Sequence, residues 1–264
     1  MTETRTDWRS ASVEKRHAYE RKVWGPWAAK YADDRRLRIT GDLVEYFESE
    51  RHAEGRAILR ALGDLAGRKV LECGCGPGTM LPLLARCGSE VWAFDLVPEV
   101  VEVARRCAQI NGVADRVHVD AASFEEMPYG DEAFDRVVGF GVLHHVNLSV
   151  AARQVHRVLK PGGVAVFSEP LGNNLLLEFA RKHLLYPGKE EHGTDVPLTD
   201  ADVTAFAAHF SSHRVEPFYF FAMIEQALGR LMPNSIFRRT DAALLRRFPG
   251  LGRYYRMAVM TFTK

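Results

Sequence analysis

The sequence lacks a long hydrophobic run. A membrane-spanning helix needs about 20 consecutive apolar residues, and nothing close to that length occurs in this chain. Residues 1–16 are polar and charged, without the apolar core of a signal peptide. We therefore expect a cytoplasmic protein with no membrane span.

Cysteine is also scarce. The chain has 4 cysteines, at Cys73, Cys75, Cys87 and Cys107. Two of them lie in a glycine-rich turn, and no second Cys or His pair stands at the spacing of zinc ligands. Because disulfides are rare in the cytosol, we expect reduced thiols and no metal site.

An excess of charge of either sign is missing as well. Lys and Arg number 35 against 34 for Asp and Glu, a net charge of +1. Such a balance gives no reason to expect binding to nucleic acid or to a membrane surface. The chain also has no internal repeat and no low-complexity linker, and its 264 residues suffice for one large domain.

From Lys69 onward, short apolar runs alternate with helical periods. The runs that predict strands are 69–73, 90–95, 116–119, 134–140 and 163–169, and the helical segments between them are roughly 79–87, 98–111 and 148–159. This alternation indicates a parallel sheet with helices on both faces. Ahead of it we expect a helix over Val13–Tyr31, broken at Gly25-Pro26, and a second over Gly41–Leu62.

The most informative segment is a glycine turn at the end of the first predicted strand. Gly74, Gly76 and Gly78 alternate with other residues directly before a helix that begins near Thr79. Glycine lets the backbone turn sharply and approach a ligand closely. Asp95 ends the next apolar run, where a carboxylate can meet ribose hydroxyls. Together these features predict a nucleoside-cofactor site.

Two cofactor classes compete for this site. A dinucleotide fingerprint reads Gly-x-Gly-x-x-Gly, whereas this chain reads Glu72-x-Gly74-x-Gly76-x-Gly78. This spacing resembles the first motif of the class I S-adenosylmethionine-dependent methyltransferases. The resemblance runs from about Lys69 to Glu169 and includes the segments 134–138, 142–145 and 157–163. An NAD-dependent oxidoreductase is the more distant alternative, and a binding module without activity is a third.

The resemblance implies a Rossmann-like, doubly wound α/β fold. Its sheet would have seven mostly parallel strands with an antiparallel C-terminal strand. Residues 1–62 would form an N-terminal helical lid and residues 63–264 the methyltransferase core. Within that core, residues 171–212 and 222–252 would be insertions on the substrate side, the latter a helical insertion before the last strand.

The resemblance also assigns roles in binding S-adenosyl-L-methionine. Glu72, Gly74, Gly76 and Gly78 would hold the methionine end, with Phe140 lining that side. Asp95 would accept hydrogen bonds from the ribose hydroxyls, and Leu96 would pack on the adenine. Ser123 and Phe124 take the places of an aspartate and a small residue in the family pattern, so there the contact to the adenine depends on the serine hydroxyl and a backbone N–H. A further hypothesis puts Tyr19 or Tyr31 on the roof over the cofactor, because aromatic faces attract a sulfonium.

Three side chains are candidate bases. His144 and His145 follow the fourth predicted strand, and Glu169 ends the fifth, where the strands of such a sheet face the ligand. Each has a structural alternative: the histidines could cap a turn, and Glu169 could anchor a loop by accepting a backbone N–H. Of these we take His145 and Glu169 as candidate catalytic residues. We add Tyr19 because of its expected place over the cofactor.

The methyl acceptor must be read from parts outside the shared core. Aromatic residues of the lid suit a small, lipophilic molecule, and the layout resembles bacterial natural-product methyltransferases of secondary metabolism. The specific hypothesis is C-methylation of a prenyl or terpenoid chain, which needs no base. The alternative is O- or N-methylation with a His or Glu base. A DNA amino-methyltransferase is a poor fit, because residues 139–143 lack that group's Asn/Asp-Pro-Pro-Tyr motif. A homo-oligomer that exchanges its N-terminal lids is also compatible with the sequence.

Overall fold

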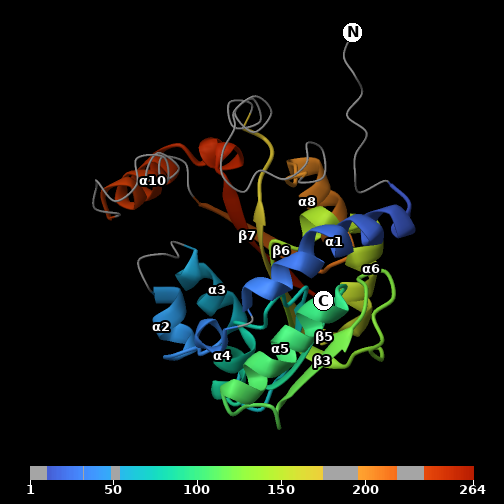
Figure 1. Cartoon of the computed structure of the whole chain (residues 1–264). Helices are drawn as coiled ribbons and strands as arrows, with labels where there is room; N and C mark the ends of the chain where they lie inside the picture. Colours follow the sequence, from blue (N-terminus) through green and yellow to red (C-terminus); the bar gives the residue numbers. More distant parts are fainter. Residues whose placement is uncertain (1–10, 32, 49–53, 175–195, 219–234) are drawn as a thin grey trace.

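A seven-stranded sheet forms the centre of the molecule (Figure 1). The computed structural model describes residues 11–31, 33–48, 54–174, 196–218 and 235–264, with the side chains of 48, 235–239, 242 and 253 left out. The strand order is β3-β2-β1-β4-β5-β7-β6. The strands are β1 Lys69–Cys73, β2 Glu90–Asp95, β3 Val117–Ala121, β4 Phe134–Phe140, β5 Leu159–Pro170, β6 Ser212–Phe218 and β7 Met257–Thr263.

Strands β1 to β5 are parallel to one another, and β7 is antiparallel to both β5 and β6. The predicted Rossmann-like class and the antiparallel C-terminal strand are thus confirmed. The helices of the described chain are α1 Val13–Ala28, α2 Leu43–Glu48, α3 Gly55–Leu62, α4 Leu81–Arg86, α5 Pro98–Ile110, α6 Leu148–Val158, α8 Asp200–Ala207 and α10 Ser235–Arg247.

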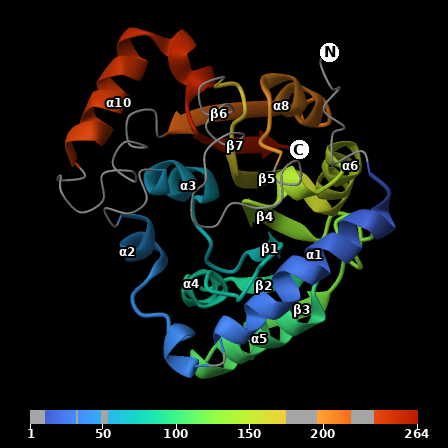
Figure 2. The ribbon, with the colours of Figure 1, turned by 45° about the horizontal axis from the view of Figure 1, so that its top comes forward.

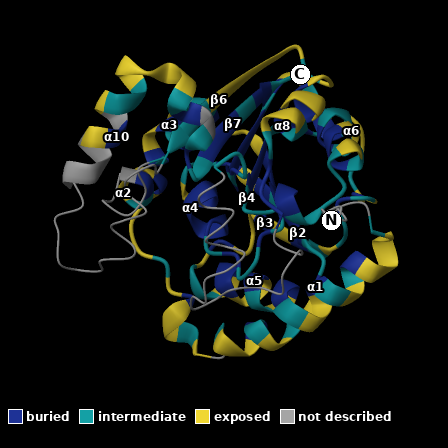
Figure 3. Cartoon of the chain, turned by 90° about the horizontal axis from the view of Figure 1, so that it is seen from above, coloured by how far each residue is buried: buried dark blue, intermediate teal, exposed yellow. Residues whose placement is uncertain are grey.

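Helices cover both faces of the sheet. Val70 of β1 belongs to a buried cluster with residues of α2, α3, α4 and α5. Its neighbour Leu71 belongs to a second cluster, with residues of α6 and α8. Strands that are buried on both faces are apolar throughout, which is why short apolar runs marked them in the sequence. Figure 3 shows these buried strands between helices whose outer sides are exposed.

The end of the parallel part differs in one detail from the prediction. Strand β5 begins at Leu159, directly after α6, whereas the sequence predicted a strand from residue 163. The pairing of β4 with β5 shifts register between Phe134 and Arg136. Phe134 pairs with Leu159 and Arg136 with Val164. The residues between the predicted helix and the predicted strand are therefore an irregularity inside the strand pair.

The predicted break in the first helix is wrong. Helix α1 continues through Pro26 to Ala28, and a short 3-10 turn, Ala29–Tyr31, follows. A proline inside a helix removes one hydrogen bond to the preceding turn. Pro26 lies in the last turn, so the helix ends two residues after it, at Ala28. The expected single helix over 41–62 is likewise replaced by α2 and α3 on either side of residues 49–53, which lie outside the described residues.

The N-terminal helices have separate places in the fold. Helices α2 and α3 contribute Leu43, Phe47, Ile58 and Leu62 to a core cluster. Helix α1 lies alongside α5, as Figure 2 shows, and its residues Trp24 and Ala28 pack with Val97 and Val100 at the start of α5. Within the predicted lid of residues 1–62, α1 is therefore the element placed over the carboxyl ends of the strands.

The region before the last strand contains α8, which Thr199 caps. The Thr199 side chain accepts a hydrogen bond from the backbone N–H of Asp202, and the Asp202 side chain accepts one from the backbone N–H of Thr199, which completes a capping box. Residues 175–195 and 219–234 of the predicted insertions lie outside the described residues. None of the described helices is long and apolar enough to cross a membrane.

Candidate active site

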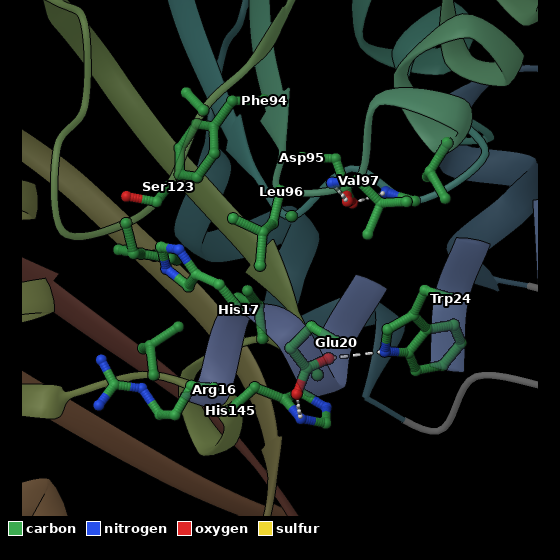
Figure 4. A pocket seen from close by; sticks show the side chains of 18 of the residues that line it. Arg16, His17, Glu20, Trp24, Phe94, Asp95, Leu96, Val97, Ser123 and His145 are labelled. Atoms are coloured by element: carbon green, nitrogen blue, oxygen red, sulfur yellow. Dashed lines mark hydrogen bonds and ion pairs between the residues drawn. The ribbon is translucent and has the colours of Figure 1, made fainter. Parts of the chain in front are cut away.

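A cavity of about 310 Å³ lies between α1 and the carboxyl ends of β1, β2 and β4 (Figure 4). It brings together eight of the residues predicted to bind cofactor or catalyse: Gly74, Gly76, Asp95, Leu96, Ser123, Phe124, Phe140 and His145. These residues come from four separate parts of the chain. The doubly wound topology gathers them because parallel strands end at the same edge of the sheet.

The glycine loop forms one wall of this cavity. Gly76 has a φ of +53°, and a Cβ added there would meet nothing within 4 Å. The backbone is therefore exposed to the cavity at a conformation that other residues rarely adopt. Gly78 has a different reason to be glycine and does not line the cavity. A Cβ there would lie 2.9 Å from Cα of Ala104, so Gly78 lets α5 pack closely on the loop.

Asp95 links the glycine loop to the start of α5. Its Oδ2 accepts a hydrogen bond from the N–H of Gly76 at 3.0 Å, and its Oδ1 accepts one from the N–H of Val97 at 3.1 Å. A carboxylate has about four acceptor positions, so both oxygens keep capacity for the two hydroxyls of a ribose. Burial raises the pKa of Asp95 despite these two hydrogen bonds, and the negative charge of Glu20 raises it further.

Glu72 lies behind the loop and is not among the residues that line the cavity. It is 3% exposed, and its Oε2 has no hydrogen-bond partner among the described residues. Burial, and then the nearby charge of Asp95, raise its pKa to about 8. A buried carboxyl oxygen without a partner is costly. Its unused capacity fits the predicted role of holding the polar methionine end of a cofactor.

The opposite wall suits a flat nucleobase. Leu96, Phe94, Ser123 and Phe124 all line it, and the rings of Phe94 and Phe124 meet edge to face with centroids 5.4 Å apart. Asp120, a nearby carboxylate, is engaged elsewhere: its Oδ2 accepts a hydrogen bond from the hydroxyl of Tyr129 at 3.2 Å.

Glu169 does not face the cavity, which corrects its prediction as a catalytic base. It is 0% exposed, and its Oε1 accepts hydrogen bonds from the N–H groups of Val142 at 2.8 Å and Leu143 at 2.9 Å. Its Oε2 lies 2.7 Å from Nδ1 of His144. Every direction from which a substrate could approach is filled, so the geometry matches the alternative of a loop anchor.

The two adjacent histidines have different surroundings. His144 is buried against Glu169, whereas His145 lines the cavity. Nδ1 of His145 lies 3.2 Å from Oε1 of Glu20 on α1, although that oxygen has no aligned hydrogen-bond donor among the described residues. Among the predicted bases, His145 is the one placed at the cavity.

Helix α1 closes the cavity with side chains that the sequence analysis did not assign to the site. Glu20 lies between His145 and Trp24, whose Nε1 donates to Glu20 Oε2 at 2.7 Å (Figure 4). About one turn closer to the start of the helix, Arg16 and His17 both contact the carboxylate of Glu125. Burial tends to raise the pKa of Glu125, but hydrogen bonds from Arg16 and His17 lower it overall. Helix α1 thus forms one wall of the cavity.

Tyr19 and Tyr31 are not among the described residues that line the cavity, which corrects their predicted place on its roof. Tyr19 is one residue before Glu20 and therefore points about 100° away from it around the helix. Tyr31 lies beyond the end of α1, where its ring packs on Trp27 with centroids 4.7 Å apart. The residues of α1 that do reach the cavity lie on one face of the helix: Arg16, His17, Glu20, Trp24 and Trp27. Their spacing was available in the sequence and would have identified the correct face.

The donors and acceptors present fit S-adenosylmethionine. Asp95 can take the ribose, the Leu96–Phe124 wall the adenine, and the glycine loop with Glu72 the methionine end. The size of the cavity also falls within the range of about 300–1,000 Å³ typical of small-ligand sites.

Comparisons with known proteins agree with this geometry. Residues 71–167 match the family model described as "Methyltransferase domain". A methyltransferase named GfsG from Streptomyces halstedii is 38% identical over 37% of this chain and 36% of its own length. The ubiquinone biosynthesis O-methyltransferase of Xanthomonas oryzae pv. oryzae is 40% identical over 38% of this chain and 42% of its own. The chain thus spans less than half the length of these curated relatives.

A solved structure of geranyl diphosphate C-methyltransferase from Streptomyces coelicolor A3(2), in complex with S-adenosyl-L-homocysteine, has a TM-score of 0.64. The match covers 96% of this chain and 100% of that chain at 15% identity, so the two share a fold. Together with the motif spacing and the cavity, these matches identify residues 71–167 as a class I, S-adenosylmethionine-dependent methyltransferase domain.

Proposed function

We propose that this protein binds S-adenosylmethionine in the cavity under α1 and transfers its methyl group to a small molecule. The observation that carries the proposal is the convergence of Gly76, Asp95, Leu96 and Phe140 on one cavity. When bound, the cofactor supplies an electrophilic methyl group, and the protein's task is to orient the reactants. Helix α1 would contribute by excluding water from the bound cofactor.

For the acceptor, we propose a small, lipophilic molecule, with C-methylation of a prenyl or terpenoid chain as the specific reaction. The aromatic rings of Trp24, Trp27 and Phe140 at the cavity support this proposal, because such rings pack on apolar chains and stabilise cations. Attack through an alkene needs no base and leaves a carbocation. The fold shared with the geranyl diphosphate C-methyltransferase supports the proposal at the level of architecture.

O- or N-methylation is the second candidate, and a specific observation favours it. His145 lines the cavity with a carboxylate, Glu20, at 3.2 Å from its Nδ1. A histidine oriented by a carboxylate is a common arrangement for a general base. In this reading His145 would accept the proton of a hydroxyl or amine during methyl transfer.

The cofactor is tested first, by calorimetric titration of the full chain with S-adenosylmethionine, S-adenosylhomocysteine and NAD. We expect both adenosyl ligands to bind and NAD not to bind; binding of NAD alone would overturn the proposal.

The acceptor is tested next with methyl-labelled cofactor, offering geranyl diphosphate and a catechol as representative alkene and hydroxyl acceptors. The bond formed is identified by mass spectrometry and NMR. For C-methylation, His145→Gln should leave the rate within about threefold, whereas for O-methylation the same change should lower it by about 100-fold.

A further inference from the structure

Helix α1 places a negative charge inside the cavity. Glu20 is 9% exposed and lines the cavity. Trp24 fixes one carboxylate oxygen through the 2.7 Å hydrogen bond to Oε2, while Oε1 has no hydrogen-bond partner among the described residues. The carboxylate is thus held in position at the cavity, with Oε1 at 3.2 Å from Nδ1 of His145.

The positive groups at the cavity only partly balance this charge. Among the described residues that line it, the basic side chains are those of Arg16, His17 and His145. Arg16 and His17 both contact Glu125, so they are already paired with a carboxylate other than Glu20. His145 is the basic group within ion-pair distance of Glu20, and a neutral imidazole would leave that carboxylate uncompensated.

A second carboxyl group, that of Asp95, lies on the same side. The charge of Glu20 acts on Asp95, adding to the effect of burial in raising the pKa of that carboxyl. Buried like charges are costly unless a cation accompanies them. This side of the cavity is therefore built for a ligand that carries positive charge.

We propose that Glu20 recognises the positive charge of the methyl donor, so that the site distinguishes the sulfonium of S-adenosylmethionine from the neutral thioether of S-adenosylhomocysteine. The inference rests on the proposed function and adds a specificity-determining residue to it. Because Glu20 belongs to α1, the same attraction holds the helix over the loaded site.

This recognition changes during turnover. When the sulfur–methyl bond breaks, both of its electrons stay on sulfur, which becomes neutral. The acceptor uses its own electron pair to bond the methyl carbon, and the positive charge leaves from the acceptor as a proton. Glu20 then faces a neutral product, so the attraction that closes α1 is lost as the product forms.

The test is isothermal titration calorimetry at pH 7.5 on the full chain, with S-adenosylmethionine and S-adenosylhomocysteine as separate ligands. Glu20→Gln keeps the shape and an acceptor for Trp24 but removes the charge. We expect it to weaken binding of S-adenosylmethionine about tenfold and to change the affinity for S-adenosylhomocysteine less than twofold. Glu125→Gln is the matched control, since it removes a carboxylate that contacts α1 through Arg16 and His17 and should leave the ratio of the two affinities unchanged.

Equal weakening of both ligands in Glu20→Gln, or no change in either, would overturn the inference. If that variant does not fold, His145→Gln gives an independent readout. Removing the basic partner of Glu20 should keep or raise the preference for S-adenosylmethionine, and a fall in that preference would refute charge recognition. A wild-type chain that binds neither ligand would refute the proposed function itself, a result distinct from a failed ratio.

Discussion

Nδ1 of His144 lies 2.7 Å from Oε2 of Glu169, in the interior of the turn that follows β4. The other oxygen of Glu169 accepts hydrogen bonds from the backbone N–H groups of Val142 and Leu143. A single carboxylate thus fixes both the backbone of this turn and the ring of His144. The next residue, His145, is turned toward the cavity as a consequence.

This arrangement predicts that Glu169→Gln lowers stability strongly. The amide would direct a donor toward N–H groups that now donate to a carboxylate, and the charge that pairs with His144 would be gone. We expect the free energy of unfolding to fall by about 2–4 kcal/mol, measured by urea denaturation at pH 7. Glu216→Gln is the control, because Glu216 pairs with a largely exposed Arg60 and should cost less than about 1 kcal/mol. Similar losses in both variants would argue against Glu169 as an anchor.

Asp95 gives a prediction about cofactor affinity. Asp95→Ala removes the carboxylate available to the ribose hydroxyls, together with its bonds to Gly76 and Val97. The loss of the hydrogen bonds from the two ribose hydroxyls should weaken the binding of S-adenosylmethionine about 10–100-fold, which is about 1.4–2.8 kcal/mol. Calorimetry measures this directly. Asp120→Asn is the control. The Asp120 carboxylate accepts a hydrogen bond from Tyr129 and does not line the cavity, so this change should alter the affinity less than twofold. If Asp95→Ala binds S-adenosylmethionine as tightly as the wild type, Asp95 does not contact the cofactor.

The parts of the fold that could be predicted are those that local pattern determines. Strands β1 to β5 are short apolar runs between helical periods, and the glycine loop and Asp95 each follow directly from the strand before them. The position of Glu20 depends instead on how α1 docks across the sheet, which involves contacts about 125 residues away at His145. The sequence indicates that docking only through residues spaced three or four apart, which share one face of α1.

Glu169 shows a second limit of sequence analysis. Its place at the carboxyl end of β5 was predicted correctly, but residues at a strand end can face the ligand or the adjoining turn. Which of the two occurs depends on the N–H groups that the turn after β4 presents. The orientation of those N–H groups depends on backbone geometry, and no residue type in the sequence indicates it.

The close packing of the glycine loop can be tested with alanine. In Gly78→Ala the new Cβ would meet Ala104 at 2.9 Å, at a φ of +76°. Gly112→Ala is a matched control, since Gly112 has a φ of +67° and nothing within 4 Å of an added Cβ. Backbone strain should lower the free energy of unfolding of both variants by about 1 kcal/mol. Overpacking should lower that of Gly78→Ala by a further amount of about 1–3 kcal/mol. Equal losses in urea denaturation would mean that α5 does not pack on the loop as described.

Glu72 leads to a prediction about pH. Burial, and then Asp95, raise its pKa in the folded chain from an ordinary 4.5 to about 8. As pH rises from about 4.5, the unfolded chain releases this proton while the folded chain retains it, so stability falls until the folded pKa is passed. Glu72→Gln removes this titration. Its free energy of unfolding should therefore improve relative to wild type between pH 5.5 and about 8.5, as measured by urea denaturation at intervals across that range. Glu102→Gln, at a side chain that is 70% exposed, should show no such trend. If the difference between Glu72→Gln and wild type stays constant with pH, Glu72 does not hold its proton in the folded chain.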